Sequence, residues 1–177
     1  MFDTIFGLPL HPLIVHATVV IVPAAVLAVA LAAAWRPFRR WAGPLPLLLS
    51  ATGLVLVPLS TSSGESLERR VPETALLEAH TRIAEGLLLP VAVLTVAAAG
   101  LFWLQRRERR RPADVSPGGL TRTRGAGRPA VVAILVGAAL GTVSTAVQVA
   151  RIGHSGAEAA WAKTAQTPPR GGEAGAR

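Results

Sequence analysis

The chain has 177 residues, of which 51% are apolar and 16% are charged, and its mean hydropathy is positive. Soluble domains carry about 25% charged residues, so this composition is that of a membrane protein. The sequence contains no cysteine, which excludes iron–sulfur clusters, disulfides and covalent haem attachment through paired cysteines. The net charge of +8 does not indicate nucleic-acid binding, because the basic residues crowd into loops beside apolar stretches.

Four apolar runs are long enough to cross a bilayer as helices. A hydrocarbon core about 30 Å thick needs roughly 20 apolar residues at about 1.5 Å each. The runs lie near residues 13–34, 41–59, 83–104 and 129–150. They predict an all-α, integral membrane four-helix bundle made of two antiparallel helix hairpins. We therefore expect one transmembrane domain over residues 1–165, with a flexible basic loop at 105–128 and a disordered tail at 166–177.

The arginines predict which side of the membrane each loop faces. Residues 35–40 contain three arginines and residues 105–128 contain eight, whereas the loop at 60–82 has three arginines offset by four glutamates. Because loops rich in Lys and Arg stay in the cytoplasm, we expect a multi-pass protein of the cell membrane with both termini extracytoplasmic. This orientation accounts for the arginines, which also suit contact with anionic lipids of the bilayer, and no nucleic-acid partner is expected.

Two local patterns refine the helices. Pro72 and Glu73 suit a first helical turn, so the third helix is expected to begin before its apolar run and to carry an exposed Glu78–Arg82 pair. Gly137 and Gly141 form a G-x-x-x-G pair in the fourth run. Such a pair lets another helix approach closely, and we expect it to serve packing within the bundle, with a homo-oligomer as the alternative.

All four histidines fall on the extracytoplasmic side in this topology. His11 and His16 lie at the start of the first helix, His80 near the outer end of the third and His154 just beyond the fourth. Gly153 is expected to end the fourth helix, so that His154 turns back across the bundle. Imidazole is a common ligand of haem iron and transition metals, and two histidines from different helices can clamp one haem. We place His16 in the centre of the site, with His80 or His154 as its partner and His11 at the rim.

These residues leave several functions open. One is binding of haem b, or of another metal, for membrane electron transfer, with a redox partner or a quinone as further partners. Glu85 could join a metal site or transfer protons, although a position near the interface also allows it to pair with Arg82 or Arg151. The alternative is a non-catalytic membrane scaffold without a cofactor. The sequence has no nucleophile elbow and no phosphate-cradling glycine loop, so an enzyme is not the favoured interpretation.

Four short motifs of the sequence, taken together, are characteristic of one protein family. They are LPLHPLIVH at 8–16, GE at 64–65, EAH at 78–80 and GHSGA at 153–157, which is followed by Trp161. In combination they resemble an uncharacterised bacterial membrane family, domain of unknown function 2231, over residues 7–161. The resemblance implies a small four-helix membrane domain, sometimes joined to redox modules such as Rieske-type domains, with no established biochemical activity. Family members often carry a Phe-Pro pair after the second histidine, where this chain has Ala17 and Thr18.

Overall fold

The computed structural model describes residues 4–5, 8–68, 74–110 and 127–165. Two short strands, β1 (Thr4–Ile5) and β2 (Leu8–Pro9), pair antiparallel. The helices that follow are α1 (Leu10–Ala34), α2 (Arg36–Ala42), α3 (Leu45–Glu68), α4 (Ala75–Glu85), α5 (Leu88–Arg109) and α6 (Arg128–Ala165). Pro72, Glu73, the tail 166–177 and most of the expected basic loop lie outside the described residues.

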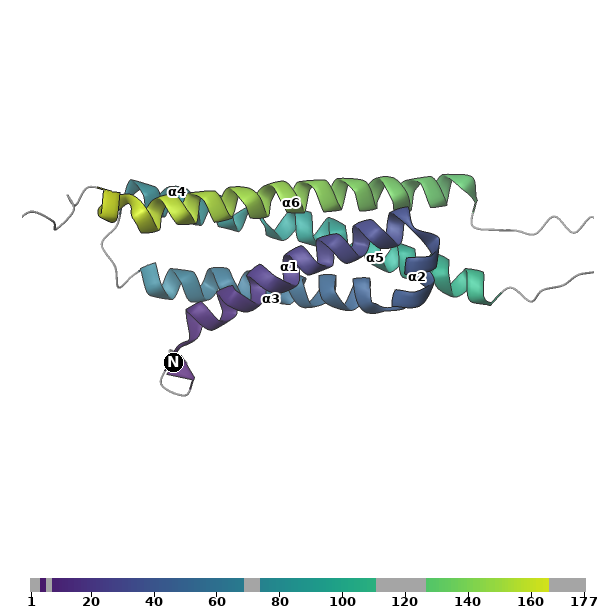
Figure 1. Cartoon of the computed structure of the whole chain (residues 1–177), viewed down its shortest axis with the longest axis horizontal. Coiled ribbons are helices and arrows are strands. Elements are labelled where there is room, and N and C mark those ends of the chain that lie inside the picture. Colours follow the sequence, from purple (N-terminus) through teal and green to yellow (C-terminus); the bar gives the residue numbers. More distant parts are fainter. Residues whose placement is uncertain (1–3, 6–7, 69–73, 111–126, 166–177) are drawn as a thin grey trace, which may run out of the picture.

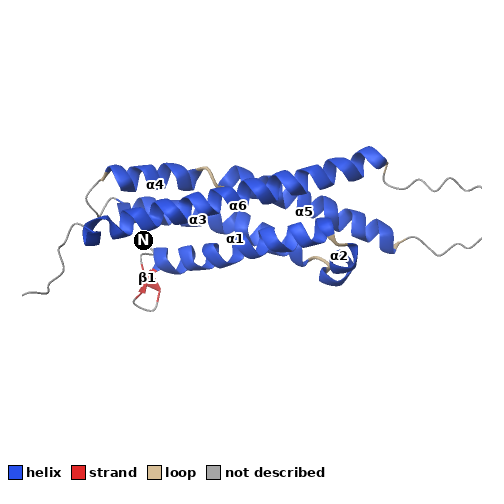
Figure 2. Ribbon diagram, turned by 45° about the horizontal axis from the view of Figure 1, so that its top comes forward, coloured by secondary structure: helices blue, strands red, loops and turns tan. Residues whose placement is uncertain are grey.

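The long helices run side by side along one axis, as Figures 1 and 2 show. Four stretches are long and apolar enough to cross a membrane: His11–Ala34, Leu45–Ser66, Ala75–Arg109 and Arg128–Glu158. The predicted all-α membrane bundle with four spans is therefore confirmed. Its two main pairings are α1 with α3 and α5 with α6.

Small residues bring α5 and α6 into close contact. A Cβ added at Gly141 would lie only 2.9 Å from the backbone N and Cα of Leu94. Leu94 and Ala138 are fully buried in the same interface. The expected use of the glycine pair for packing inside the bundle is thus met at Gly141, where only a glycine allows this approach.

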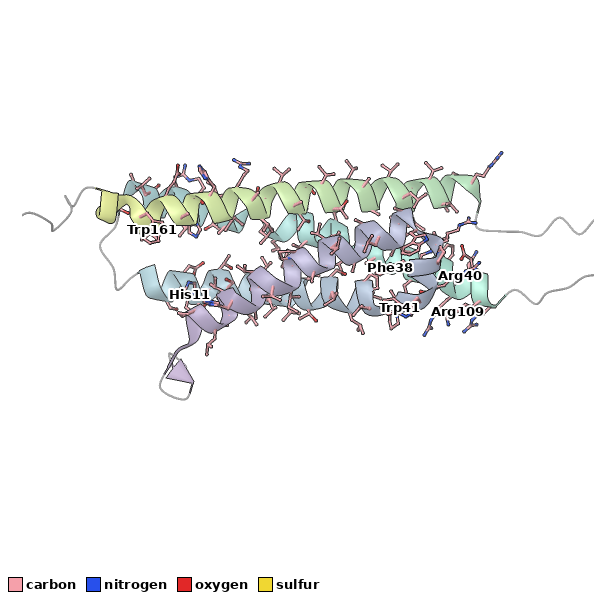
Figure 3. All side chains as sticks on the ribbon, viewed as in Figure 1. His11, Phe38, Arg40, Trp41, Arg109 and Trp161 are labelled. Carbon is pink, nitrogen blue, oxygen red and sulfur yellow. The ribbon has the colours of Figure 1, made fainter. Side chains whose placement is uncertain are left out.

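One end of the bundle carries most of the described arginines and is called the arginine end below. Figure 3 shows Phe38, Arg40, Trp41 and Arg109 gathered there, opposite His11. Residues 35–40, expected as a loop, mostly belong to α2, a short helix with a proline in its first turn. The following Gly43 has a φ of 59°, which suits a glycine and separates α2 from α3.

A buried ion pair fixes α2 to α5 at the arginine end. The Arg39 guanidinium is buried and donates to Glu108 Oε1 at 3.2 Å and to the carbonyl of Ala32 at 3.2 Å. Gln105 Nε2 donates to the carbonyl of Arg40 at 3.2 Å. Because an arginine is buried only when it is paired, these bonds hold α2 across the end of the bundle.

The third span is broken between α4 and α5. Pro90 has no N–H, so it cannot bond the carbonyl of Gly86 in the helical pattern. Gln148 of α6 reaches across and donates from Nε2 to the carbonyl of Ile83 at 2.5 Å. The Ile83 carbonyl also accepts from the N–H of Gly86 at 3.2 Å, so Gln148 adds a second bond that ties the break to α6.

Two expectations about α4 and α6 have different outcomes. The expected Glu78–Arg82 pair is confirmed, with an N–O distance of 2.7 Å. The expectation that Gly153 ends the fourth helix is wrong, because α6 continues to Ala165. His154 and Glu158 lie one turn apart on this continuing helix and form an ion pair when the imidazole is protonated.

Candidate functional site: a cavity lined by two histidines

A cavity of about 360 Å³ lies at the end of the bundle opposite the arginine end. This end, called the histidine end below, is where α1 begins, α3 and α6 end, and α4 lies (Figure 1). The polar residues lining the cavity are His11, Thr18, Ser60, Thr61, Glu65, His80, Thr81 and Glu85. The volume falls within the range of about 300–1,000 Å³ that is typical of small-molecule sites.

Helical spacing places His11 on the inner face of α1. His11, Val15, Thr18 and Val22 all line the cavity, and they are separated by four, three and four residues. Residues at this spacing share one face of a helix, and the same face continues into buried Ala25. The ring of His11 therefore extends the buried stripe of α1 to its first turn.

His11 is held by a serine of α3. Its Nδ1 lies 2.9 Å from Ser63 Oγ, and Ser63 Oγ lies 2.9 Å from the carbonyl of Ser60. A hydroxyl has one proton, so both bonds form together only when Nδ1–H donates to Oγ and Oγ–H donates to the carbonyl. In neutral His11 this leaves the lone pair on Nε2. The ring lies against Gly64, where a Cβ would stand 3.3 Å from its Cε1.

His80 of α4 is held in the same way by α6. Its Nδ1 lies 2.9 Å from Ser155 Oγ, which in turn donates to the carbonyl of Ile152 at 3.1 Å. The neighbouring Gly156 leaves room for the ring, because a Cβ there would stand 3.2 Å from Cε1 of His80. Neutral His80 therefore also keeps its lone pair on Nε2.

The other two histidines lie outside the cavity. The side chain of His16 is exposed, and its Nδ1–H donates to the carbonyl of Pro12 at 2.6 Å. His154 is 78% exposed at its side chain and lies 3.2 Å from Glu158. His11, expected at the rim of the site, therefore lines the cavity, and His16, expected at its centre, does not. Five residues at about 100° each put their side chains about 140° apart on the helix, so one faces the cavity and the other does not.

Glu85 lines the cavity and is exposed, as is Glu65 of α3. Arg82, one of the partners expected for Glu85, pairs instead with Glu78. Within the described ranges, no group of three or more histidines and carboxylates is placed to hold a metal ion.

The sequence analysis did not identify the two Ser-Gly pairs that hold His11 and His80, in which the serine bonds the ring and the glycine leaves room for it. The signal was the dipeptide itself, which occurs at 63–64 and again at 155–156, near the ends of two long helices. Together these supports fix two imidazoles, from α1 and α4, at one cavity. Each ring can accept a hydrogen bond, or coordinate an ion, through Nε2.

The fold and the cavity define a multi-pass membrane protein with a ligand-sized site at one end of its bundle. The chain belongs to the family described as predicted membrane protein DUF2231, whose model matches residues 7–169. No curated protein and no solved structure matches the chain.

Proposed function

We propose that this protein serves membrane electron transfer and holds a redox-active group in the cavity between His11 and His80. The observation that supports the proposal is the matched pair of serine-held imidazoles, both lining one cavity. An Nδ1–H that is bonded to a fixed acceptor orients the ring and raises the basicity of Nε2, as in histidines that bind metals. The non-catalytic scaffold is the alternative, in which the same two bonds only tie α1 to α3 and α4 to α6.

The redox-active group could be haem b or a quinone. Two histidines from different helices are sufficient as the axial ligands of a haem, and the iron supplies one-electron chemistry when it is bound. The proposed ligands are His11 and His80, because His16 and His154 lie outside the cavity. A quinone would use the same imidazoles as hydrogen-bond partners and would reach the site from the bilayer.

The content of the purified protein tests this proposal. After expression with ample haem and extraction in a mild detergent, three quantities are measured on one sample: the visible spectrum oxidised and reduced, total metals, and redox-active lipids in an organic extract. We expect one redox-active group per chain. A preparation with no haem, no stoichiometric metal and no quinone would refute the proposal and leave the non-catalytic scaffold.

We also propose that the histidine end faces away from the cytoplasm in the cell membrane. The support is the arginine excess at the opposite end, which includes Arg36, Arg40 and the stretch 106–110. The chain has no cysteine, so single cysteines introduced near 62 and near 109 can be labelled in intact cells without background. Labelling at 109 but not at 62 by an impermeant reagent would reverse this orientation.

A further inference from the structure

The threonines around the cavity have their hydroxyl protons committed to the backbone. Thr18, Thr61 and Thr81 each donate to a carbonyl three or four residues earlier on the same helix, at 2.8, 3.0 and 3.0 Å. Since a hydroxyl has one proton, each of these oxygens offers only lone pairs to a molecule in the cavity.

Apart from Ser60, whose hydroxyl can donate or accept, the remaining polar side chains of the cavity are acceptors as well. His11 and His80 donate through Nδ1 to serines, so in the neutral form each offers a lone pair at Nε2. Glu65 and Glu85 add carboxylate oxygens. Neither a lysine nor an arginine is among the cavity residues in the described ranges. Since acceptors outnumber donors on this wall, a molecule that supplies hydrogen-bond donors suits it best.

The two strongest acceptors form a matched pair. His11 rests on Ser63 and Gly64 of α3, and His80 rests on Ser155 and Gly156 of α6, with the same 2.9 Å bond in each case. The cavity therefore presents the same acceptor from two different helices, α1 and α4. A ligand with two equivalent hydrogen-bond donors, one at each end of a ring, suits these two equivalent acceptors.

The deep part of the cavity is apolar and reaches the lateral surface of the bundle. Val19 and Pro23 of α1 both line the cavity and are exposed. From His11 to Pro23 the cavity follows α1 for about 18 Å, at about 1.5 Å per residue. Val15, Val22 and their neighbours supply hydrocarbon along this path. A polar head at the histidines and an apolar tail toward the bilayer match this shape.

We infer that the cavity binds a lipid-soluble para-hydroquinone, whose two hydroxyl groups donate to Nε2 of His11 and Nε2 of His80. The inference rests on the proposed function and names its redox-active group. Haem b suits the cavity less well, because the described lining contains two carboxylates, Glu65 and Glu85, and no lysine or arginine that could pair with its propionates. The oxidised quinone has only acceptor oxygens, so it binds more weakly than the hydroquinone.

The test is a ligand series on the unmodified protein in mild detergent at about pH 8, where an ordinary imidazole is neutral. The probes are a para-hydroquinone with a decyl chain, its oxidised quinone, its dimethyl ether and decylamine. All are titrated without oxygen, and the dissociation constants are compared. We expect the hydroquinone to bind at least tenfold more tightly than the quinone and the ether. A tenfold preference would raise the midpoint potential of the bound couple by about 30 mV.

Variants then locate the binding site. His11→Ala and His80→Ala should each weaken hydroquinone binding about tenfold and leave the weak binding of the ether unchanged. His16→Ala is the matched control, because this histidine lies outside the cavity, and it should bind as the wild type does. If an alanine variant does not fold, the ligand series on the unmodified protein decides by itself.

The possible outcomes separate this inference from the proposed function. Equal affinity for the hydroquinone and the ether, tighter binding of the quinone, or displacement by decylamine at lower concentration would each overturn the inference. A haem spectrum without hydroquinone binding would also overturn it, while the proposed function would stand. The absence of haem, metal and quinone from the protein, together with no binding of either probe form, would refute both.

Discussion

Gly141 offers the sharpest test of how the bundle is held together. A Cβ at this position would lie 2.9 Å from the N and Cα of Leu94 and 3.3 Å from the carbonyl carbon of Val93. These atoms belong to the backbone and cannot rotate away. Since carbon atoms pack at about 3.5–4.0 Å, Gly141→Ala forces α5 and α6 apart by about 0.6–1 Å. Overpacking of this kind costs about 1–3 kcal/mol.

Gly153→Ala is the matched control on the same helix. A Cβ at Gly153 meets nothing within 4 Å. Alanine is a better helix former than glycine by up to about 1 kcal/mol, so this variant should be as stable as the wild type or slightly more so. The free energy of unfolding is measured by titrating detergent-solubilised protein with denaturant and following helical circular dichroism. The packing argument fails if Gly141→Ala proves as stable as Gly153→Ala.

Three further predictions concern bonds between elements. Glu108→Gln leaves the buried guanidinium of Arg39 without its charge partner and should lower the unfolding free energy by about 2–3 kcal/mol. The control is Glu78→Gln, which breaks an exposed pair and should lower the unfolding free energy by less than about 1 kcal/mol. Similar losses in the two denaturation curves would contradict this prediction. Gln148→Leu removes the bond that ties the break between α4 and α5 to α6, and it should destabilise the protein by about 0.6–2 kcal/mol and speed amide exchange in α4. Unchanged exchange rates would rule this out. Ser155→Ala removes the acceptor for Nδ1–H of His80 and should weaken hydroquinone binding severalfold without loss of helicity. An unchanged dissociation constant for the hydroquinone would show that the serine does not orient the ring.

The number of spans follows from the sequence, but the ends of the helices do not. The apolar runs identify four spans because about 20 apolar residues are needed to cross the bilayer. The second apolar run predicts a helix that ends near Leu59, but α3 continues to Glu68. The hydroxyls of Thr61, Ser62 and Ser63 each bond a carbonyl of their own helix, so a polar stretch remains helical beyond the apolar run. Hydropathy alone does not predict this polar extension of α3.

The location of the histidines at one end follows from the topology, whereas their direction does not. α1 is apolar on nearly every side, so its sequence gives no strong amphipathic pattern from which to decide whether His11 or His16 faces inward. Thr18 was the available signal, because it is polar, lies within the apolar run and follows His11 by seven residues, on the same face of the helix. The serine partners come from distant helices, and their pairing required the folded structure.

The most direct test of the central claim compares two variants that each remove one imidazole. The redox-active group that copurifies per chain is measured for wild type, His80→Ala and His16→Ala under the same expression and extraction. If the group lies between His11 and His80, His80→Ala should lose at least nine-tenths of it and His16→Ala should keep the wild-type amount. Equal retention in both variants, or loss in His16→Ala alone, would contradict the account.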